Sequence, residues 1–146
     1  GSVLYIAHLG PVLYCAFCTF KTGSLLCTSC QEMRFFMDDF NFSSNLLYEN
    51  LRILKQYYPF IQMGSIGKSI MVKDIPFIKV GNGKKEVFYS ASFHANEWIT
   101  SLVLLEFLYD YCYAIQTNST IWNFNARRLF DSVSIYIVPL VNPDRC

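Results

Sequence analysis

The sequence predicts an α/β fold in which a mixed, partly parallel sheet is covered by helices. Short apolar segments that suit strands occur on both sides of one long apolar segment, residues 97–115, that suits a helix. Strands joined through a helix commonly lie parallel in one sheet, because the helix crosses over a face of that sheet. A chain of 146 residues is also long enough for one domain with its own core.

The first predicted elements are a helix over residues 45–58 and three strands. Leu47, Leu51 and Leu54 recur at helical spacing, and Ser44 or Asn45 can cap the helix. The strands are expected over residues 60–63, 75–80 and 86–93, with turns at 64–67 and 81–83. The Gly-Asn-Gly run at 81–83 indicates a hairpin between the second and third strands.

The long helix is expected over residues 97–115, with Asn96 as its N-cap. Apolar side chains cover most of its circumference, which predicts packing on several sides. A loop at 118–120, a short helix over 122–130 and a last strand over 133–137 follow. The strand is expected to end at the tight turn Asn142-Pro143-Asp144.

Composition places a boundary between an apolar leader, residues 1–44, and a domain over residues 45–146. Residues 3–20 are nearly all apolar, but a Gly-Pro break and the lack of a basic segment before them leave membrane association of the leader open. Two Cys-x-x-Cys pairs follow, and a Cys₄ metal module, disulfides and unpaired thiols all remain open for them. The pairs are Cys15 with Cys18 and Cys27 with Cys30.

Charge and motif spacing argue against two classes of partner. The net charge of +1 gives no electrostatic argument for nucleic acid or for an anionic membrane. Gly67-Lys68-Ser69 looks like the end of a phosphate-binding loop, but that loop needs a glycine where Gln62 stands. We therefore expect neither a nucleic acid nor a nucleotide as ligand.

The candidate site is the pair His94 and Glu97, between the third strand and the long helix. Two intervening residues at such a turn let both side chains reach one point, and imidazole and carboxylate are ligands of catalytic zinc. The spacing alone is also compatible with a structural histidine at a strand end and a glutamate favoured by the helix N-terminus.

Four segments in order strengthen the metal interpretation. They are Gly64-Ser-Ile-Gly-Lys-Ser69, Ile75-Pro-Phe-Ile-Lys-Val-Gly-Asn-Gly83, Phe93-His-Ala-Asn-Glu-Trp-Ile-Thr100 and Tyr136-Ile-Val-Pro-Leu-Val-Asn-Pro-Asp144. Over residues 46–144 the chain resembles the N-terminal part of the M14 zinc carboxypeptidases. It is most similar to the branch that cleaves γ-D-glutamyl-diamino acid bonds in bacterial cell-wall peptides.

The resemblance implies a zinc carboxypeptidase-like fold, truncated to its N-terminal half, and a Zn²⁺ ion held by His94, Glu97 and a second histidine. It also implies a peptide substrate, in particular a peptidoglycan stem peptide, and a location outside the cell or in its envelope. In that family the second histidine, the general base and the substrate-binding arginine, asparagine and tyrosine follow the Asn-Pro-Asp turn. Here Arg145 replaces the usual glycine after that turn, and His8 is the only other histidine.

We therefore expect this chain by itself to be catalytically incomplete, and we assign it no catalytic residue. Two alternatives stand beside the peptidase interpretation. One is a non-catalytic binding or assembly module that keeps the peptidase half-fold. The other is a Cys₄ zinc module fused to an unrelated α/β domain.

Overall fold

The computed structural model describes residues 42–94 and 96–145. The predicted leader, except for its last residues, therefore lies outside the described part, as do its two cysteine pairs and His8. The boundary between residues 44 and 45 stays a prediction.

The elements run α3 (Ser44–Tyr57), β1 (Gln62–Lys68), β2 (Asp74–Val80), β3 (Lys85–Ser90), α4 (Trp98–Gln116), β4 (Thr120–Ile121), β5 (Phe124–Asn125), α5 (Ala126–Ser132), β6 (Val133–Val138) and the 3₁₀ helix η2 (Pro143–Arg145).

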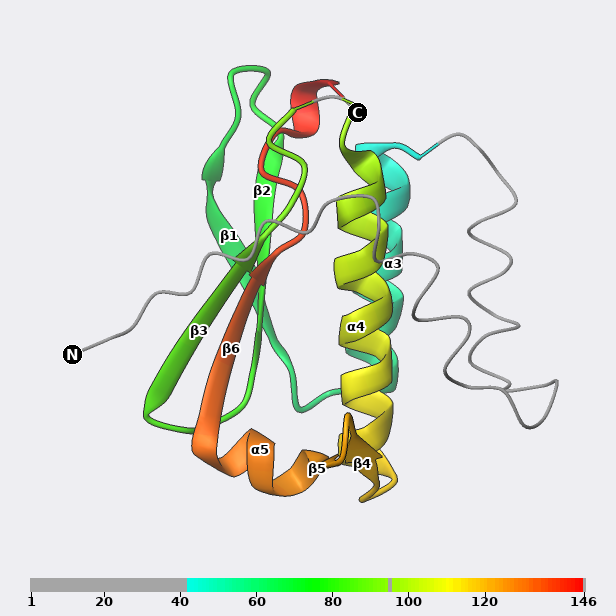
Figure 1. The fold of residues 1–146 in the computed structure, drawn as a ribbon. Coiled ribbons are helices and arrows are strands. Elements are labelled where there is room, and N and C mark those ends of the chain that lie inside the picture. Colours follow the sequence, from blue (N-terminus) through cyan, green and yellow to red (C-terminus); the bar gives the residue numbers. More distant parts are fainter. Residues whose placement is uncertain (1–41, 95, 146) are drawn as a thin grey trace, which may run out of the picture.

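The main sheet is mixed and partly parallel, which confirms the predicted fold class. Its strand order is β1-β2-β6-β3. β2 is antiparallel to both of its neighbours, β1 and β6, and β3 is parallel to β6. Figure 1 shows α3 and α4 side by side along one side of this sheet. The carboxyl ends of β3 and β6 consequently meet at the same edge, which is the upper end of the molecule in the figure.

The core lies between the sheet and the two helices. Along β2 every second side chain is buried, which is the two-residue period of a strand, whereas the central strand β6 buries adjacent residues as well. Each fully buried Leu or Ile contributes roughly 1.5–3 kcal/mol relative to exposure. The fully buried aliphatic side chains are Leu47, Leu51, Leu54, Ile61, Ile78, Val80, Leu108, Ile115, Ile137, Val138 and Leu140.

The expected hairpin between β2 and β3 is wrong, because β6 lies between these two strands. The segment 81–83 instead crosses the start of β6 at backbone contact. A Cβ atom on Gly83 would lie 1.8 Å from the carbonyl carbon of Ser132, and one on Gly81 would lie 2.0 Å from the carbonyl oxygen of Val133. The glycines are therefore required by close approach of two backbone segments rather than by a tight turn.

Two boundaries near the start of the domain differ from prediction. Ser43 caps α3, because its hydroxyl accepts from the Leu46 N–H at 3.3 Å; neither Ser44 nor Asn45 does. The expected turn at 64–67 lies inside β1, which bulges between Ser65 and Gly67. The turn of this hairpin comes later, at residues 69–73, where Val72 has the left-handed φ of 62°.

Two later boundaries also shift. Glu97, and not Asn96, is the N-cap of α4, and it caps through no side-chain hydrogen bond. The short helix expected at 122–130 begins only at Ala126, because the Asn125 side chain caps it by accepting from the Arg128 N–H at 2.9 Å. The β4–β5 hairpin occupies the preceding residues.

The helix α4 is the one described helix long and apolar enough to cross a membrane, with a mean hydropathy of 1.2. Core helices satisfy the same criterion. We interpret α4 as a core helix because a continuous set of its side chains is buried against the sheet and its neighbours. These side chains are Ser101, Leu104, Leu105, Leu108, Tyr111, Cys112, Ala114 and Ile115.

Candidate metal-binding turn

The turn that carries the candidate ligands connects β3 to α4 at the edge where β3 and β6 both end. Past the ends of these strands their parallel pairing continues through irregular backbone. The Ala91 N–H donates to the Val138 carbonyl at 3.1 Å, and the Val141 N–H donates to the Ala91 carbonyl at 3.0 Å. The Asn142 N–H donates to the Ser92 carbonyl at 3.1 Å. The turn is therefore supported by a segment about 50 residues away in sequence.

A buried hydroxyl cluster fixes the start of the turn. Ser92 has a φ of 54°, a conformation that is uncommon for a residue other than glycine. Its N–H donates to the Thr100 hydroxyl at 3.0 Å, and its own hydroxyl lies 2.6 Å from that of Ser101. Ser101 in turn donates to the carbonyl oxygen of Pro139, so one network joins β3, α4 and the segment after β6.

The same cluster fixes the start of α4. The Ser92 and Thr100 hydroxyls donate to the Glu97 carbonyl at 3.1 and 2.7 Å, and the Glu97 N–H donates to the His94 carbonyl at 3.1 Å. The backbone of both candidate ligands is thereby held in one tight turn. Sequence reasoning missed Ser92, Thr100 and Ser101, and no spacing signal distinguishes these small hydroxyl residues from ordinary loop and helix residues.

His94 is exposed and Glu97 is half-buried. Within the part of the chain that the structure describes, neither side chain makes a hydrogen bond or an ion pair. Zinc is coordinated by imidazole nitrogens and carboxylate oxygens, so both side chains are of a type that can bind this metal.

The number of donors is smaller than a zinc site needs. Among the described residues no group of three or more His, Cys, Asp or Glu side chains is arranged to hold a metal ion. The turn thus offers two candidate donors, and a zinc site of the three-ligand type would need a third.

The Asn142–Asp144 turn adjoins the candidate site. The Asn142 side chain donates to the Phe93 carbonyl at 3.3 Å, next to His94. The Asp144 carboxylate accepts from the Ser69 hydroxyl at 2.5 Å and from the Met71 N–H at 3.1 Å. The hydrogen bond from Ser69 is the main reason that the pKa of Asp144 lies below its ordinary value. Asp144 therefore ties the β1–β2 hairpin to the edge that carries His94.

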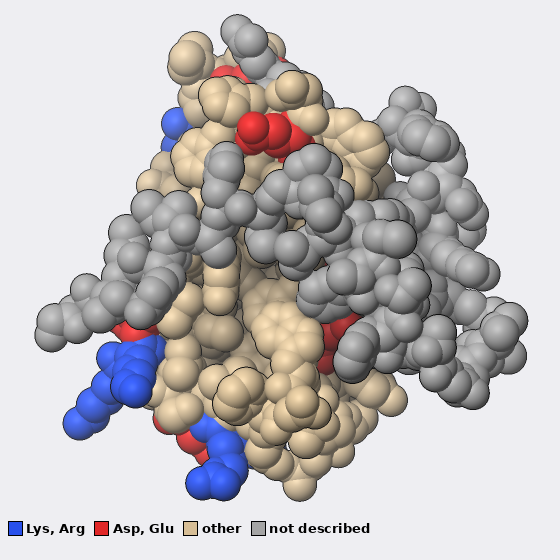
Figure 2. All heavy atoms as spheres, in the orientation of Figure 1, with Lys and Arg blue, Asp and Glu red and all other residues tan. Residues whose placement is uncertain are grey.

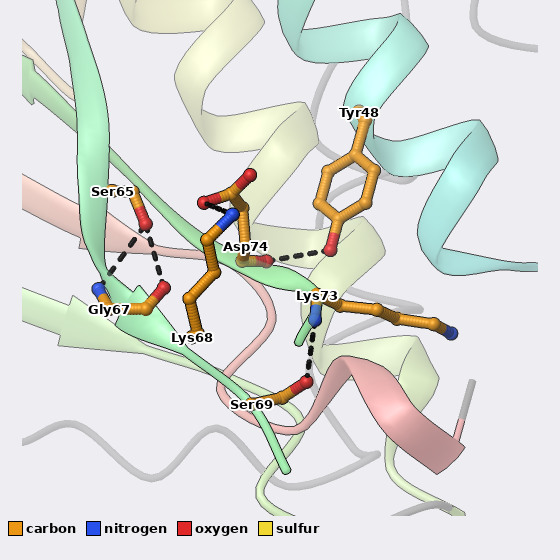
Figure 3. A network of polar contacts seen from close by, with 7 residues as sticks. All are labelled: Tyr48, Ser65, Gly67, Lys68, Ser69, Lys73 and Asp74. Carbon is orange, nitrogen blue, oxygen red and sulfur yellow. Dashed lines mark hydrogen bonds and ion pairs between the residues drawn. The ribbon is translucent and has the colours of Figure 1, made fainter. Parts of the chain in front are cut away.

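The segment that resembles a phosphate-binding loop is used structurally. Figure 3 shows Lys68 on Asp74, with 2.8 Å between Nζ and Oδ1, and the Ser69 hydroxyl accepting from the Lys73 N–H at 3.0 Å. Tyr48 of α3 donates to the Asp74 carbonyl at 2.6 Å in the same view. The side chains of this segment are thus engaged in holding the hairpin against α3 and the Asn142–Asp144 turn.

A histidine and a glutamate on one turn at the carboxyl edge of a mixed sheet are the kind of arrangement that metal-dependent hydrolases use. The family model for zinc carboxypeptidases, peptidase family M14, matches residues 47–144. The chain therefore belongs to the zinc carboxypeptidase family M14, which confirms the resemblance seen in the sequence.

Two curated relatives give the scale of the match. The chain is 39% identical over 104 residues to γ-D-glutamyl-L-diamino acid endopeptidase 1 of Lysinibacillus sphaericus, covering 71% of this chain and 26% of that protein. It is 33% identical over 90 residues to a zinc carboxypeptidase of Saccharothrix mutabilis subsp. capreolus, covering 58% and 20%. The chain thus spans about a quarter or less of the length of these relatives.

Solved structures agree with the fold. Bovine thrombin-activatable fibrinolysis inhibitor, in complex with tick carboxypeptidase inhibitor, matches with a TM-score of 0.59 and 26% identity, over 71% of this chain and 32% of that one. A metallo-carboxypeptidase from Burkholderia cenocepacia matches with a TM-score of 0.58 and 22% identity, over 70% and 27%. The sheet and its two helices are therefore a part of the zinc carboxypeptidase fold.

Proposed function

We propose that this chain supplies two zinc ligands, His94 and Glu97, to a zinc-dependent peptidase. The observation that carries the proposal is the turn itself. Its backbone is fixed by a buried hydroxyl cluster, while its imidazole and carboxylate make no hydrogen bond or ion pair with another described residue. Zinc bound there would lower the pKa of a bound water to about 7 and polarise the scissile carbonyl.

The proposed substrate is a cell-wall peptide, cleaved at a γ-D-glutamyl-diamino acid bond. This specificity rests on the 39% identity to a γ-D-glutamyl-L-diamino acid endopeptidase. An enzyme with that substrate meets it outside the cell or in the envelope, so we propose this location as well.

We further propose that these 146 residues alone bind zinc weakly and do not hydrolyse peptides. The sequence contains only two histidines, His8 and His94, so a site with two histidines and one glutamate needs His8 or a ligand from outside these residues. We place the general base outside them too, by the order of residues that the family resemblance implies. Detectable metal-dependent hydrolysis of a γ-D-glutamyl-diamino acid peptide by the purified chain would contradict this part of the proposal.

A second candidate function is a binding or assembly module without catalysis. It is favoured by the lack of any third suitable donor near His94 and Glu97 among the described residues. In that case the turn keeps its shape because the hydroxyl cluster holds it, and the chain carries no metal.

Zinc stoichiometry separates these functions. The purified full chain should bind zinc, and His94→Ala or Glu97→Gln should weaken binding by about tenfold or more, because each removes a direct ligand. Glu49→Gln is the matched control, since Glu49 is an exposed carboxylate on α3 that pairs with Arg52.

The remaining outcomes each select another interpretation. Zinc binding that is lost in Cys15→Ser but kept in His94→Ala would assign the metal to the cysteine pairs. No zinc in any form of the chain would favour the binding module. Equal affinity in the wild type, His94→Ala and Glu97→Gln would contradict the proposed site.

A further inference from the structure

Ser92 joins the turn that carries the candidate ligands to the segment after β6. Its side chain is 1% exposed, and its φ of 54° lies in the left-handed region. Glycine is favoured at such a φ, because it has no Cβ atom. A serine therefore stands here against the preference of the backbone. An outlier of this kind indicates that the side chain, here a hydroxyl group, has a use.

The hydroxyl protons of the cluster can be assigned one by one, because each hydroxyl group has one proton to donate. The Thr100 hydroxyl donates to the Glu97 carbonyl at 2.7 Å, and the Ser101 hydroxyl donates to the Pro139 carbonyl. The remaining proton belongs to Ser92, whose oxygen lies 2.6 Å from Ser101 Oγ and 3.1 Å from the Glu97 carbonyl oxygen. Ser92 therefore donates mainly to Ser101, with the Glu97 carbonyl within reach of the same proton.

Two chains of hydrogen bonds consequently start at Ser92. One runs from its N–H to the Thr100 hydroxyl at 3.0 Å and on to the Glu97 carbonyl. The other runs from its hydroxyl to the Ser101 hydroxyl and on to the Pro139 carbonyl. The Glu97 carbonyl is thus held, through Ser92, in a fixed relation to the end of β6. Loss of the Ser92 hydroxyl would keep the first chain and break the second.

We propose that Ser92 is a positioning residue for zinc binding, because its hydroxyl fixes the backbone that carries both candidate ligands. This inference rests on the proposed zinc site. The Glu97 N–H donates to the His94 carbonyl at 3.1 Å, so the fixed position of Glu97 extends to His94. Ligands whose backbone is fixed before binding lose less conformational entropy when the metal binds.

The charges around the turn do not depend on Ser92. Figure 2 shows acidic side chains near the upper end of the molecule, whereas the larger groups of basic side chains lie at the lower left and at the bottom. Glu97 and Asp144 belong to this upper edge, where β3 and β6 end. Such an edge attracts a cation from a distance. Ser92→Gly leaves every charge in place, so a change in its zinc affinity reports on geometry.

The first test compares the full chain with its Ser92→Gly variant in stability and in zinc affinity. The urea midpoint should change little, because glycine suits the φ at this position and this relief offsets the lost hydrogen bond. Calorimetric titration should nevertheless show zinc affinity lower by about tenfold, the smaller end of the range for groups that orient metal ligands. The binding event compared is the one that His94→Ala removes.

Hydrogen exchange in the absence of metal measures the positioning itself. The Glu97 and Thr100 amides both donate within the turn, to the His94 and Glu97 carbonyls. In Ser92→Gly these two amides should exchange about tenfold faster, because the turn opens more often. The buried second half of α4, residues 104–115, should exchange as in the wild type.

Ser134→Ala is the matched control. Ser134 is also a buried serine, 2% exposed, but it lies at the start of β6 and donates to the Gly83 carbonyl at 2.8 Å. Its removal should lower the urea midpoint and leave zinc affinity and the two amides unchanged. Ser101→Ala should weaken zinc binding like Ser92→Gly, and the double variant should be no weaker than either, because both break one chain.

Three outcomes would overturn the proposal. They are equal zinc affinity in the wild type and Ser92→Gly, a loss of affinity no larger than in Ser134→Ala, and unchanged exchange of the Glu97 and Thr100 amides. Each of these leaves the proposed zinc site standing. A wild-type chain without any zinc binding that depends on His94 would instead refute the proposed function, and this inference with it.

Discussion

The substitution Gly83→Ala gives a direct test of the crossing that orders the sheet. Its Cβ atom would lie 1.8 Å from the carbonyl carbon of Ser132, and no rotation of a side chain can relieve an overlap with backbone. The crossing segment must then move away from β6. We expect the free energy of unfolding to fall substantially, because the segment is held by specific hydrogen bonds that this movement breaks.

Two hydrogen bonds set the magnitude. The Asn82 N–H donates to the Phe130 carbonyl at 2.8 Å, and the buried Ser134 hydroxyl shares its one proton between the carbonyl oxygens of Gly81 and Gly83 at 3.2 and 2.8 Å. At about 1 kcal/mol each, their loss costs about 2 kcal/mol. Since such domains are stable by only about 5–15 kcal/mol, this is a large fraction of the total.

Urea unfolding followed by far-UV circular dichroism measures the effect. With a slope of about 1–3 kcal/mol per molar urea, the midpoint should fall by about 0.7–2 M. Asn82→Ala is the matched control, because Asn82 is exposed and its backbone N–H remains, so the change should stay within about 0.5 kcal/mol. A Gly83→Ala protein as stable as this control would refute the close approach of the two segments.

Two further predictions concern the β1–β2 hairpin. Val72 has a φ of 62° and is 70% exposed, so Val72→Gly should raise the free energy of unfolding by about 0.5 kcal/mol, because it relieves a strain of about 1–2 kcal/mol and costs the extra chain entropy of glycine. Val72→Ala should not raise the free energy of unfolding. A Val72→Gly protein that is destabilised in urea would argue against the strain. Because the pKa of Asp144 is lower in the folded than in the unfolded state, its carboxylate adds to the free energy of unfolding above the unfolded pKa of about 3.8. This stabilisation is lost as the pH falls through the folded-state pKa. Asp144→Asn should therefore lower the urea midpoint at pH 7 and lower it less at pH 3, and an equal deficit at both pH values would contradict this assignment.

The strand–turn–helix that carries His94 and Glu97 was predictable because its signals are local. An apolar strand, a polar turn and a long apolar helix follow one another within 30 residues, and each has its own periodicity. That histidine and glutamate side chains are of types that bind zinc was also evident from the sequence. The family followed from short segments of sequence, which need no knowledge of how the chain is packed.

The errors arose where long-range packing decides the structure. Gly81 and Gly83 have the local pattern of a hairpin, and only the insertion of β6 shows that they serve a close approach. Gly64 was taken for a turn residue but lies in β1, where a Cβ atom would meet the Phe77 ring at 2.6 Å. The roles of Ser92 and Ser101 depend on the carbonyl oxygen of Pro139, a partner 38 residues from Ser101. A short stretch of sequence does not show which distant segment each of these residues contacts.

The parallel pairing of β3 with β6 has a consequence for how the protein is made. Lys85 pairs with Val133, so the two paired strands are 48 residues apart (133 − 85). At about 5–20 residues per second, a ribosome needs about 2–10 seconds to synthesise that interval. His94 and Glu97 therefore leave the ribosome before the strand that supports their turn exists. The turn that carries both residues therefore reaches its supported form only after β6 has been made.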